Sequence, residues 1–390
     1  MNKKKICVVT GSRSDYGLIY WTLKKFNHSK YVELNIIVTG MHLQKEYGYT
    51  LNEIEKDGFK IYKKINIHNK KKSQTHVSDS ISSGIKKFTN TFLNNKFDLL
   101  LLVGDRFETF AAAIAATLSH TPIAHIHGGE VTVGAFDESF RHSISKMSHI
   151  HFTSTQIYKN RLIQMGERPT KIFNIGAPGI ENIYKLKLLD KKKIEKKLNF
   201  KFSKKNLIIT YHPVTLDNKK AKLQFQSILK SLDKLNDTFL IFTKSNSDPE
   251  GNLINEMIDS YVSLNSHKSI SFFSLGNLNY LSVLKIVDGI VGNSSSGLIE
   301  APSLKKGTIN IGDRQLGRVF AKNVINCSYN TKKIDNALKK LFSLKFKNQL
   351  KKIINPYGNG IVSDKILKII LKTELKNIIK KKFYDIKKIK

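Results

Sequence analysis

Short apolar, β-branched runs alternate with longer amphipathic stretches along most of the chain. The first run covers residues 6–10, a stretch of helical periodicity follows over residues 14–26, and similar pairs recur up to about residue 311. Strands of this length separated by helices are typical of a parallel sheet with helices on both faces. The pattern therefore predicts an α/β fold of the doubly wound, Rossmann-like kind.

The alternation is interrupted by a Lys-rich stretch over residues 185–205 and then starts again. A chain of 390 residues is also too long for one ordinary domain and suits two of roughly 150–200 residues. We predict an N-terminal Rossmann-like domain over residues 1–180 and a C-terminal one over residues 181–355. Residues 356–390 are expected to pack back on these domains, with a long basic amphipathic helix over residues 365–390.

Each sheet is expected to present its carboxyl edge to a central cleft between the domains, because ligands of doubly wound folds bind at that edge. The polar motifs should then follow the strands directly. The expected strands of the first domain are 6–10, 34–38, 99–103, 122–126 and 150–153, and those of the second are 207–211, 239–242, 270–273, 289–292 and 308–311.

The formal net charge of +35 would ordinarily favour nucleic acid or an anionic membrane as a partner. Only seven of the 66 basic residues are arginine, however, and the lysines are scattered, without an Arg-rich stripe or interleaved aromatic residues. This skew is typical of a biased codon usage acting on surface positions. We therefore predict neither nucleic acid nor membrane as a partner.

The cysteines indicate a reducing compartment. Cys7 and Cys327 form neither a disulfide framework nor a metal-ligand spacing. The chain also contains no run of about 18 apolar residues, as a membrane span would require. We expect a cytoplasmic protein.

Two loops after strands have the character of phosphate-binding loops. In the sequence TGSRSDYG a strand turns into a helix and offers backbone N–H groups to an anion, with Arg13 placed to bind a diphosphate. In the sequence VGNSSSGLIE small residues and hydroxyl groups follow a later strand, and Glu300 could accept hydrogen bonds from a ribose. The alternative is a pair of tight, Ser-capped turns. The predicted binding residues of the second loop are Asn293, Ser294, Ser295, Ser296, Gly297 and Glu300.

Neither loop matches the dinucleotide or the ATP-binding pattern, so no nicotinamide or ATP site is predicted. The few arginines carry information in a chain so rich in lysine, because lysine cannot form the two-pronged contact of a guanidinium with phosphate or carboxylate. Arg106 and Arg314 lie within motif segments and are predicted to bind substrate, with a plain ion pair as the alternative.

Acidic and histidine side chains follow three further strands. Asp105 ends an apolar strand, Glu130 follows HIHGG, and Asp137 begins the next helix. Carboxylates at strand ends that face a cleft suit general acid or base chemistry, although an acid in a first helical turn also stabilises the helix. His212, in TYHP, could donate to a leaving group or could be a buried structural histidine.

His125 and His127 share a face of their strand and, with Glu130, could in principle hold a metal. No second cluster offers the remaining ligands. We therefore predict no metal site.

Taken in order, the motifs GSRSDYG, GDRFE, HIHGGE, FDESFRHSISKMSH, TYHP, GNSSSGLIEAPS and IGDRQLGR resemble those of the hydrolysing UDP-N-acetylglucosamine 2-epimerases of bacterial sialic acid synthesis. The similarity runs from about residue 4 to residue 325. It implies a GT-B-like fold, no metal or redox cofactor, and a homodimer or homotetramer. It also implies a UDP-sugar substrate, which loses UDP by elimination to 2-acetamidoglucal before hydration yields N-acetylmannosamine.

Inversion at C2 requires acid/base groups on opposite faces of the ring, and the leaving UDP requires cationic or hydrogen-bonding support. The resemblance assigns the acid/base roles to Asp105, Glu130 and Asp137, and support of the leaving group to Arg13, His212 and residues 294–296. Related epimerases often carry a glutamate at the position of His127. The missing carboxylate role could pass to Glu130 or to His127, and we favour Glu130, with His127 as a binding residue.

The sequence thus predicts a hydrolysing UDP-N-acetylglucosamine 2-epimerase. The alternative with the same chemistry is a 2-epimerase of a UDP- or GDP-linked 2,4-diacetamido-2,4,6-trideoxyhexose. Alternatives from other classes are a GT-B glycosyltransferase, which would not need all three carboxylates, and a nucleotide-sugar-binding regulator without catalysis.

Overall fold

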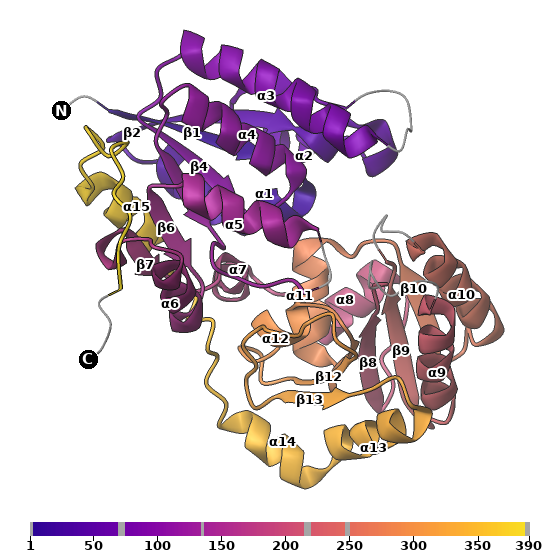
Figure 1. Ribbon diagram of the computed structural model, residues 1–390. Coiled ribbons are helices and arrows are strands. Elements are labelled where there is room, and N and C mark those ends of the chain that lie inside the picture. The colour runs from indigo at the N-terminus through magenta and orange to yellow at the C-terminus, as the bar shows by residue number, and fades with distance from the viewer. Residues whose placement is uncertain (1–2, 69–74, 134–135, 214–219, 246–249, 387–390) are drawn as a thin grey trace. The chain divides into compact units, whose positions relative to one another are not determined.

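The computed structural model describes residues 3–68, 75–133, 136–213, 220–245 and 250–386 (Figure 1). The chain forms two compact units. The first unit contains residues 1–130, 136–181 and 360–390, and the second contains residues 131–135 and 182–359. The cleft expected between the two units stays a prediction.

The first unit is built on a seven-stranded, fully parallel sheet of order β3-β2-β1-β4-β5-β6-β7. Helices follow the strands in alternation, as the sequence pattern predicts. The strands are β1 (Lys4–Thr10), β2 (Val32–Thr39), β3 (Ile61–Ile65), β4 (Leu99–Val103), β5 (Ile123–Ile126), β6 (Ile150–Thr153) and β7 (Ile172–Asn174), and the helices are α1 (Arg13–Asn27), α2 (Leu51–Lys56), α3 (His76–Asn94), α4 (Phe107–Leu118), α5 (Asp137–Met147), α6 (Gln156–Gln164), α7 (Pro178–Lys185) and α15 (Ser363–Lys372).

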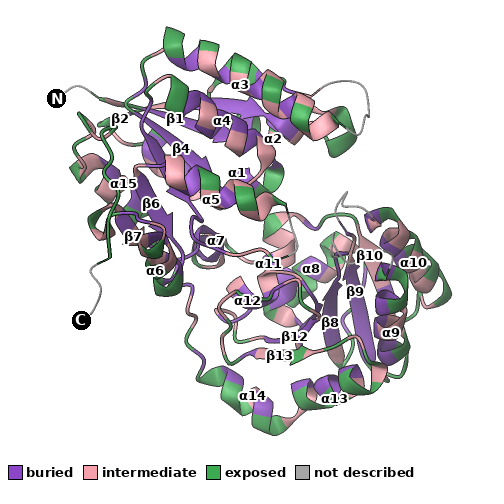
Figure 2. Cartoon of the chain, in the orientation of Figure 1, coloured by how far each residue is buried: buried purple, intermediate pink, exposed green. Residues whose placement is uncertain are grey.

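Helices cover both faces of this sheet because successive side chains of a strand point to opposite faces. In β1, Ile6 and Val8 join a core with α1, α2 and α15, whereas Cys7 and Val9 join a core with α3, α4 and α5. Figure 2 shows the consequence: the strands are buried and the helices expose only their outer sides. A strand buried on both faces reads as a continuous apolar run, which is why these strands are recognisable in the sequence.

The second unit repeats this plan on a six-stranded parallel sheet of order β10-β9-β8-β11-β12-β13. One face packs on α9, α10, α13 and α14, and the other on α8 and α11. The strands are β8 (Lys205–Thr210), β9 (Thr238–Thr243), β10 (Ser269–Phe272), β11 (Gly289–Gly292), β12 (Gly307–Ile311) and β13 (Val324–Cys327), and the helices are α8 (Lys191–Leu198), α9 (Ala221–Asp233), α10 (Gly251–Leu264), α11 (Gly276–Ile286), α12 (Ser296–Ile299), α13 (Thr331–Phe342) and α14 (Leu344–Lys351).

Both sheets contain a point at which the strand order reverses. In the first unit the chain adds β2 and β3 on one side of β1 and then returns to place β4 on the other, and in the second unit β8 and β11 have the same relation. Ligands of doubly wound sheets bind outside the carboxyl ends of the strands at such points. The loops after β1 and β4, and those after β8 and β11, are therefore where each unit would bind a ligand.

The terminal segment differs from the prediction. Helix α15 ends at Lys372, so the long basic helix expected over residues 365–390 is wrong. Ile366 and Ile370 of α15 enter the core of the first unit. The chain beyond α15 is held to this unit by the Lys381 ammonium group and by the backbone N–H of Tyr384, which donates to the Gly166 carbonyl oxygen at 2.9 Å. There the buried carboxylate of Glu167 accepts hydrogen bonds from Lys146 and His151 at 2.7 and 3.0 Å and pairs with Lys381 at 2.8 Å.

Candidate active site

The loop after β1 begins α1 and contains the first predicted phosphate-binding residue. The Ser12 side chain caps α1 by accepting a hydrogen bond from the backbone N–H of Asp15 at 3.3 Å. Arg13 points to the neighbouring helix α2, where its Nε lies 3.2 Å from Oε2 of Glu53, and 48% of its side chain is exposed. The guanidinium is thus accessible to an anion, and its role in binding a diphosphate stays a prediction.

Asp15, in the same loop, is a functional candidate that the sequence analysis did not single out. The residue is buried, and its Oδ2 has no hydrogen-bond partner among the described residues. Burial raises the pKa of this carboxyl to about 6, although the nearby Arg106 guanidinium acts in the opposite direction. Asp15 therefore titrates close to neutral pH, as acid/base groups of enzymes do.

Arg106, in the loop after β4, forms a partly buried ion pair with Glu108 in the first turn of α4. Nε and Nη2 of Arg106 donate to the two carboxylate oxygens of Glu108 at 3.2 and 3.1 Å. Glu108 is fully buried, and its side chain fills the space beside Gly11 and Gly40, where a Cβ would lie 3.4 and 2.6 Å from Glu108 atoms. Glu108, also missed by the sequence analysis, fixes the guanidinium against the loops after β1 and β2.

A second guanidinium organises the other predicted acids. Arg141, on α5, pairs with Asp105 through Nη2 and donates through Nη1 to the carbonyl oxygen of His127 at 3.1 Å. Asp137 lies one helical turn before Arg141, on the same side of α5. Because β4 and β5 are adjacent in the sheet, Asp105, Asp137 and His127 are brought together at its carboxyl edge.

The environment of Asp137 shifts its titration. Partial burial and the nearby Asp105 carboxylate raise the pKa of Asp137 to about 6, and the Arg106 and Arg141 guanidinium groups oppose this increase. A carboxyl group with such a pKa can remove or return a proton near neutral pH. The acid/base role of Asp137 stays a prediction.

His127 and Glu130 are joined directly. Nδ1 of His127 lies 2.5 Å from Oε1 of Glu130, and that same oxygen accepts a hydrogen bond from Oγ of Ser154 at 2.6 Å. His127 has a left-handed backbone (φ 67°), which a histidine seldom adopts. Its Nε2 is buried and has no hydrogen-bond partner within the described chain. The two residues that the sequence offered as alternatives therefore form one pair.

His125 has a structural environment. Its Nε2 lies 2.7 Å from the carbonyl oxygen of Gly104, and its Nδ1 lies 3.2 Å from Oγ of Ser145. Burial lowers the pKa of the imidazole to about 3. Both ring nitrogens are thus engaged, and the described residues contain no group of three or more His, Cys, Asp or Glu side chains arranged to hold a metal.

In the second unit the loops after β8 and β11 are joined through Asn293. Its Oδ1 accepts from the backbone N–H of His212 at 2.8 Å, and its Nδ2 donates to the His212 carbonyl at 2.7 Å. Gly292 has a φ of 134°, and a Cβ there would lie 1.9 Å from the carbonyl oxygen of Thr210. Only glycine fits where the two loops approach so closely.

The His212 imidazole is neutral near physiological pH. Burial, together with the nearby Arg314 guanidinium, lowers its pKa to about 3. Nδ1 lies 3.2 Å from Oγ of Ser245. A neutral ring can still donate one hydrogen bond to a leaving group. We therefore predict that His212 acts as an uncharged donor.

The remaining predicted residues of the second unit surround the same loop. Arg314 and Gln315 both donate to the Asn293 carbonyl oxygen, at 3.3 and 2.7 Å. The sequence analysis did not identify Gln315 as a site residue. Helix α12 is a single turn, so the loop offers N–H groups and hydroxyls without a long helix dipole. Ser294, Ser295 and Ser296 are partly exposed, Gly297 is buried, and Glu300 lies at the end of α12.

The predicted site residues thus form two groups. Each group follows the strands at the reversal point of its own sheet and the next strand along, β5 in the first unit and β12 in the second. The first unit holds Arg13, Asp105, Arg106, His127, Glu130 and Asp137, and the second holds His212, Asn293, Ser294, Ser295, Ser296, Gly297, Glu300 and Arg314.

The family model described as UDP-N-acetylglucosamine 2-epimerase matches residues 24–371. The chain is 44% identical to the GDP/UDP-N,N'-diacetylbacillosamine 2-epimerase (hydrolyzing) of Campylobacter jejuni, over 99% of this chain and 100% of that one. It is 38% identical to the polysialic acid biosynthesis protein P7 of Escherichia coli, over 98% of each chain. The UDP-N,N'-diacetylbacillosamine 2-epimerase (hydrolyzing) of Legionella pneumophila is 37% identical, over 94% of this chain and 95% of that one.

A solved structure of the UDP-N-acetylglucosamine 2-epimerase from Neisseria meningitidis has the same fold. The TM-score is 0.73 at 22% identity, over 95% of this chain and 100% of that one. The fold predicted from the sequence, two Rossmann-like doubly wound domains of the GT-B-like class, is confirmed by this likeness and by the two parallel sheets. From the extent of the family match and the identity to curated relatives, the chain belongs to the UDP-N-acetylglucosamine 2-epimerase family.

Proposed function

We propose that this protein is a hydrolysing 2-epimerase of a UDP- or GDP-linked 2,4-diacetamido-2,4,6-trideoxyhexose, namely N,N'-diacetylbacillosamine. The Campylobacter and Legionella relatives, at 44% and 37% identity, are named for this substrate. The comparisons therefore support the alternative of the sequence analysis better than its first choice, UDP-N-acetylglucosamine. The family and the type of reaction are common to both.

The proposed reaction has two stages. A base removes the proton from C2, the C1–O bond breaks, and its electron pair leaves with the nucleoside diphosphate, so that a C1=C2 double bond forms. Water then adds its oxygen to C1, and a proton returns to C2 on the opposite face. The products are the nucleoside diphosphate and the free sugar inverted at C2.

The observation that carries this proposal is the grouping of acids at the carboxyl edge of the first sheet. Asp137 has a pKa raised to about 6 beside Asp105, which is paired with Arg141. A carboxyl group with a pKa of about 6 can remove a proton near neutral pH. We assign removal of the C2 proton to Asp137, and Asp105, held by Arg141, is the neighbouring carboxylate that raises the pKa of Asp137.

We further assign the return of the proton to the pair of His127 and Glu130. Glu130 would accept a hydrogen bond from Nδ1–H of His127, which leaves the buried Nε2 as the exchanging nitrogen. A carboxylate that holds an imidazole in this way orients the ring and stabilises its charged form. Glu130, which we favoured as the acid, becomes the group that supports His127.

The loops of the second unit are proposed to bind the nucleoside diphosphate. Backbone N–H groups and hydroxyls of residues 293–296 would bind the phosphates, His212 would donate a hydrogen bond to them, and Glu300 would bind the ribose. In the first unit Arg13 and Arg106 would supply positive charge for the leaving group. No cofactor is proposed, and the homodimer or homotetramer implied by the family resemblance stays a prediction.

The second candidate substrate is UDP-N-acetylglucosamine. The E. coli relative, named for polysialic acid biosynthesis at 38% identity, favours it. The two sugars differ at C4 and C6, away from the reacting carbons, so the same acid/base groups serve either.

The test is to incubate the purified protein in deuterated water with the UDP- and GDP-linked diacetamido sugar and with UDP-N-acetylglucosamine, and to follow each by NMR. We expect the diacetamido substrate to have at least a tenfold higher kcat/KM and to yield a free sugar inverted and deuterated at C2. A higher kcat/KM for UDP-N-acetylglucosamine would establish the second candidate. A nucleotide-linked product, or no release of nucleoside diphosphate, would overturn the hydrolysing reaction.

A further inference from the structure

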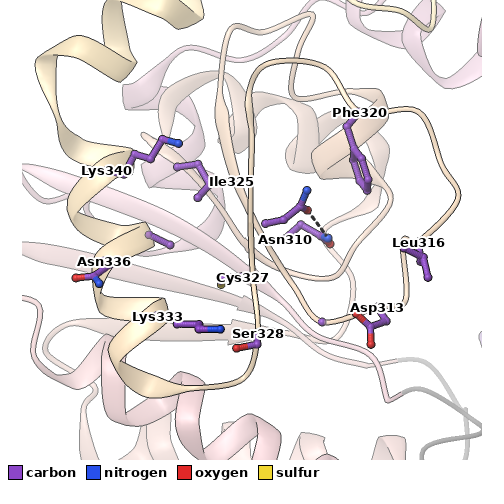
Figure 3. Close-up of a pocket in the computed structure, with 13 residues that line it drawn as sticks. Asn310, Asp313, Leu316, Phe320, Ile325, Cys327, Ser328, Lys333, Asn336 and Lys340 are labelled. Carbon is purple, nitrogen blue, oxygen red and sulfur yellow. Dashed lines mark hydrogen bonds between the residues drawn. The ribbon is translucent and has the colours of Figure 1, made fainter.

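A cavity of about 610 Å³ opens in the second unit beside the edge strand β13 (Figure 3). Its walls are the loop after β12, strand β13 and helix α13. The volume lies within the range of small-molecule sites. None of the residues assigned above to the nucleotide or to acid/base chemistry lines this cavity.

One wall contains a buried amide with an unused acceptor. Asn310 is 3% exposed, and its Nδ2 donates to Oδ1 of Asn326 at 2.9 Å. Oδ1 of Asn310 has no hydrogen-bond partner in the described parts of the chain. Because buried carbonyl oxygens are nearly always hydrogen-bonded, this atom favours a ligand that brings an O–H or N–H donor into the cavity.

The facing wall is cationic. Lys333 and Lys340 lie seven residues apart on α13 and therefore on the same side of the helix (Figure 3). The ion pairs found between described residues do not include either ammonium group. Two lysines on one cavity wall favour a ligand with a carboxylate or phosphate group.

The loop after β12 adds an apolar surface. Leu316 and Phe320 line the cavity and are exposed, at 56% and 36%. Such surfaces pack against the C–H face of a sugar ring. Asp313 also lines the cavity and can accept a hydrogen bond from a hydroxyl, although its charge would repel an anion placed next to it.

The same loop contacts the proposed nucleotide site. Asp313 and Leu316 line the cavity, whereas Arg314 and Gln315 between them donate to the carbonyl oxygen of Asn293. Movement of this loop by a ligand would therefore move the groups that hold Asn293. The cavity and the loop after β11 share one short segment of chain.

We propose that this cavity binds a small acidic carbohydrate, a hydroxylated ring with a carboxylate or phosphate group, and that its occupancy alters nucleotide binding at residues 293–296. The anionic group pairs with Lys333 and Lys340, a ring hydroxyl donates to Asn310, and the ring packs on Phe320. The inference of binding depends only on the residues of the cavity, whereas the effect on nucleotide binding rests on the proposed function.

Binding is tested by isothermal titration of the full-length protein with D-glucuronic acid, D-glucose 6-phosphate and neutral D-glucose. We expect at least one acid to bind with a dissociation constant below about 1 mM and glucose to bind at least tenfold more weakly. The two acids distinguish a carboxylate ligand from a phosphate ligand. If neither acid binds up to 10 mM, about ten times that limit, the site is refuted.

Matched variants on α13 locate the binding. Lys333→Glu with Lys340→Glu, and separately Asn336→Trp at the cavity wall, should each raise the dissociation constant at least tenfold. The control Lys332→Glu with Lys339→Glu makes the same charge change on exposed α13 positions that do not line the cavity. Circular dichroism and Tm confirm folding. Binding that survives both cavity variants, or that the control pair weakens equally, overturns the assignment.

The effect on nucleotide binding is tested by titrating UDP with and without saturating acid. We expect the dissociation constant of UDP to change at least threefold in the wild type and to stay unchanged in the Asn336→Trp variant. An unchanged UDP affinity in the wild type overturns the coupling. If UDP fails to bind even without acid, the nucleotide assignment fails instead, and the titration of the acid still decides the cavity.

Discussion

The pair of His127 and Glu130 gives a direct test of the proposed chemistry through the substitution Glu130→Gln. The carboxylate is 4% exposed and accepts hydrogen bonds from His127 and Ser154 at 2.5 and 2.6 Å. The amide keeps the shape of the side chain but removes the charge that stabilises a protonated imidazole. A hydrogen bond to a charged group contributes roughly 1.5–3 kcal/mol, so kcat should fall about 10- to 150-fold.

KM should change less than about threefold, because the pair does not bind the nucleotide in this scheme. The variant His127→Ala removes the exchanging nitrogen itself and should lower kcat further, by at least about 1000-fold. Release of nucleoside diphosphate and deuterium incorporation at C2 measure both values. The matched control is Glu138→Gln, because Glu138 also contacts a histidine, His142, at 3.0 Å within α5. This variant should keep kcat within about twofold.

The opposite ranking of the two variants would refute this assignment. If Glu130→Gln abolishes turnover while His127→Ala retains it within about tenfold, Glu130 is itself the acid/base group, as the sequence resemblance first implied. If the Glu138→Gln control loses as much activity as Glu130→Gln, the effect of Glu130→Gln does not report on the pair. Equal, full activity of Glu130→Gln and His127→Ala would remove the pair from the mechanism.

Three further predictions concern other parts of the molecule. Because a base must be ionised and Asp137 has a pKa of about 6, kcat/KM should decrease as the pH falls below about 6. Arg106→Met removes a cation that lowers the pKa of Asp137, so the acidic limb of the pH–rate profile should move to higher pH. Gly292→Ala places a Cβ 1.9 Å from the carbonyl oxygen of Thr210 and should weaken UDP binding by at least about tenfold, as titration would show. Burial raises the pKa of Glu167, but hydrogen bonds to its carboxylate outweigh this effect and lower the value to about 2. Its stabilisation is therefore present above its unfolded pKa near 4.5 and lost as the pH falls toward 2, and Glu167→Gln should cost about 3 kcal/mol in urea unfolding at pH 7.

The sequence predicted the central strands and the loops that follow them because strands buried on both faces are continuous apolar runs. It did not predict β3, β7 and β13. These strands lie at or near sheet edges and are short or partly polar, as edge strands usually are. The helix expected over residues 365–390 ends at Lys372, because a basic amphipathic pattern does not show where the chain leaves the helix to contact other parts of the fold.

Several site residues could not be identified from the sequence for a common reason. An acid in a first helical turn is explained adequately by the helix dipole, and both Asp15 and Glu108 occupy such positions. Both side chains are buried by neighbouring loops that are distant in the sequence. Burial raises the pKa of Asp15, and it places Glu108 where it binds Arg106. The contact of His127 with Glu130 depends in the same way on an unusual backbone at His127, which residue spacing does not reveal.

The charges at the carboxyl edge of the first sheet explain which acids can exchange protons. Four carboxyl groups of this edge, Asp15, Asp105, Glu108 and Asp137, lie around the Arg106 and Arg141 guanidinium groups. Two of the four have a guanidinium partner, Glu108 with Arg106 and Asp105 with Arg141. The two acids without an ion pair in the described structure, Asp15 and Asp137, are the ones whose pKa is raised to about 6.

This excess of negative charge occurs in a chain with a net charge of +35, so composition does not account for it. A carboxyl group with a pKa of about 6, as in Asp15 and Asp137, can both bind and release a proton near neutral pH. The arrangement thus provides exchangeable protons at neutral pH beside fixed charges, which is what inversion at a carbon next to a departing diphosphate requires.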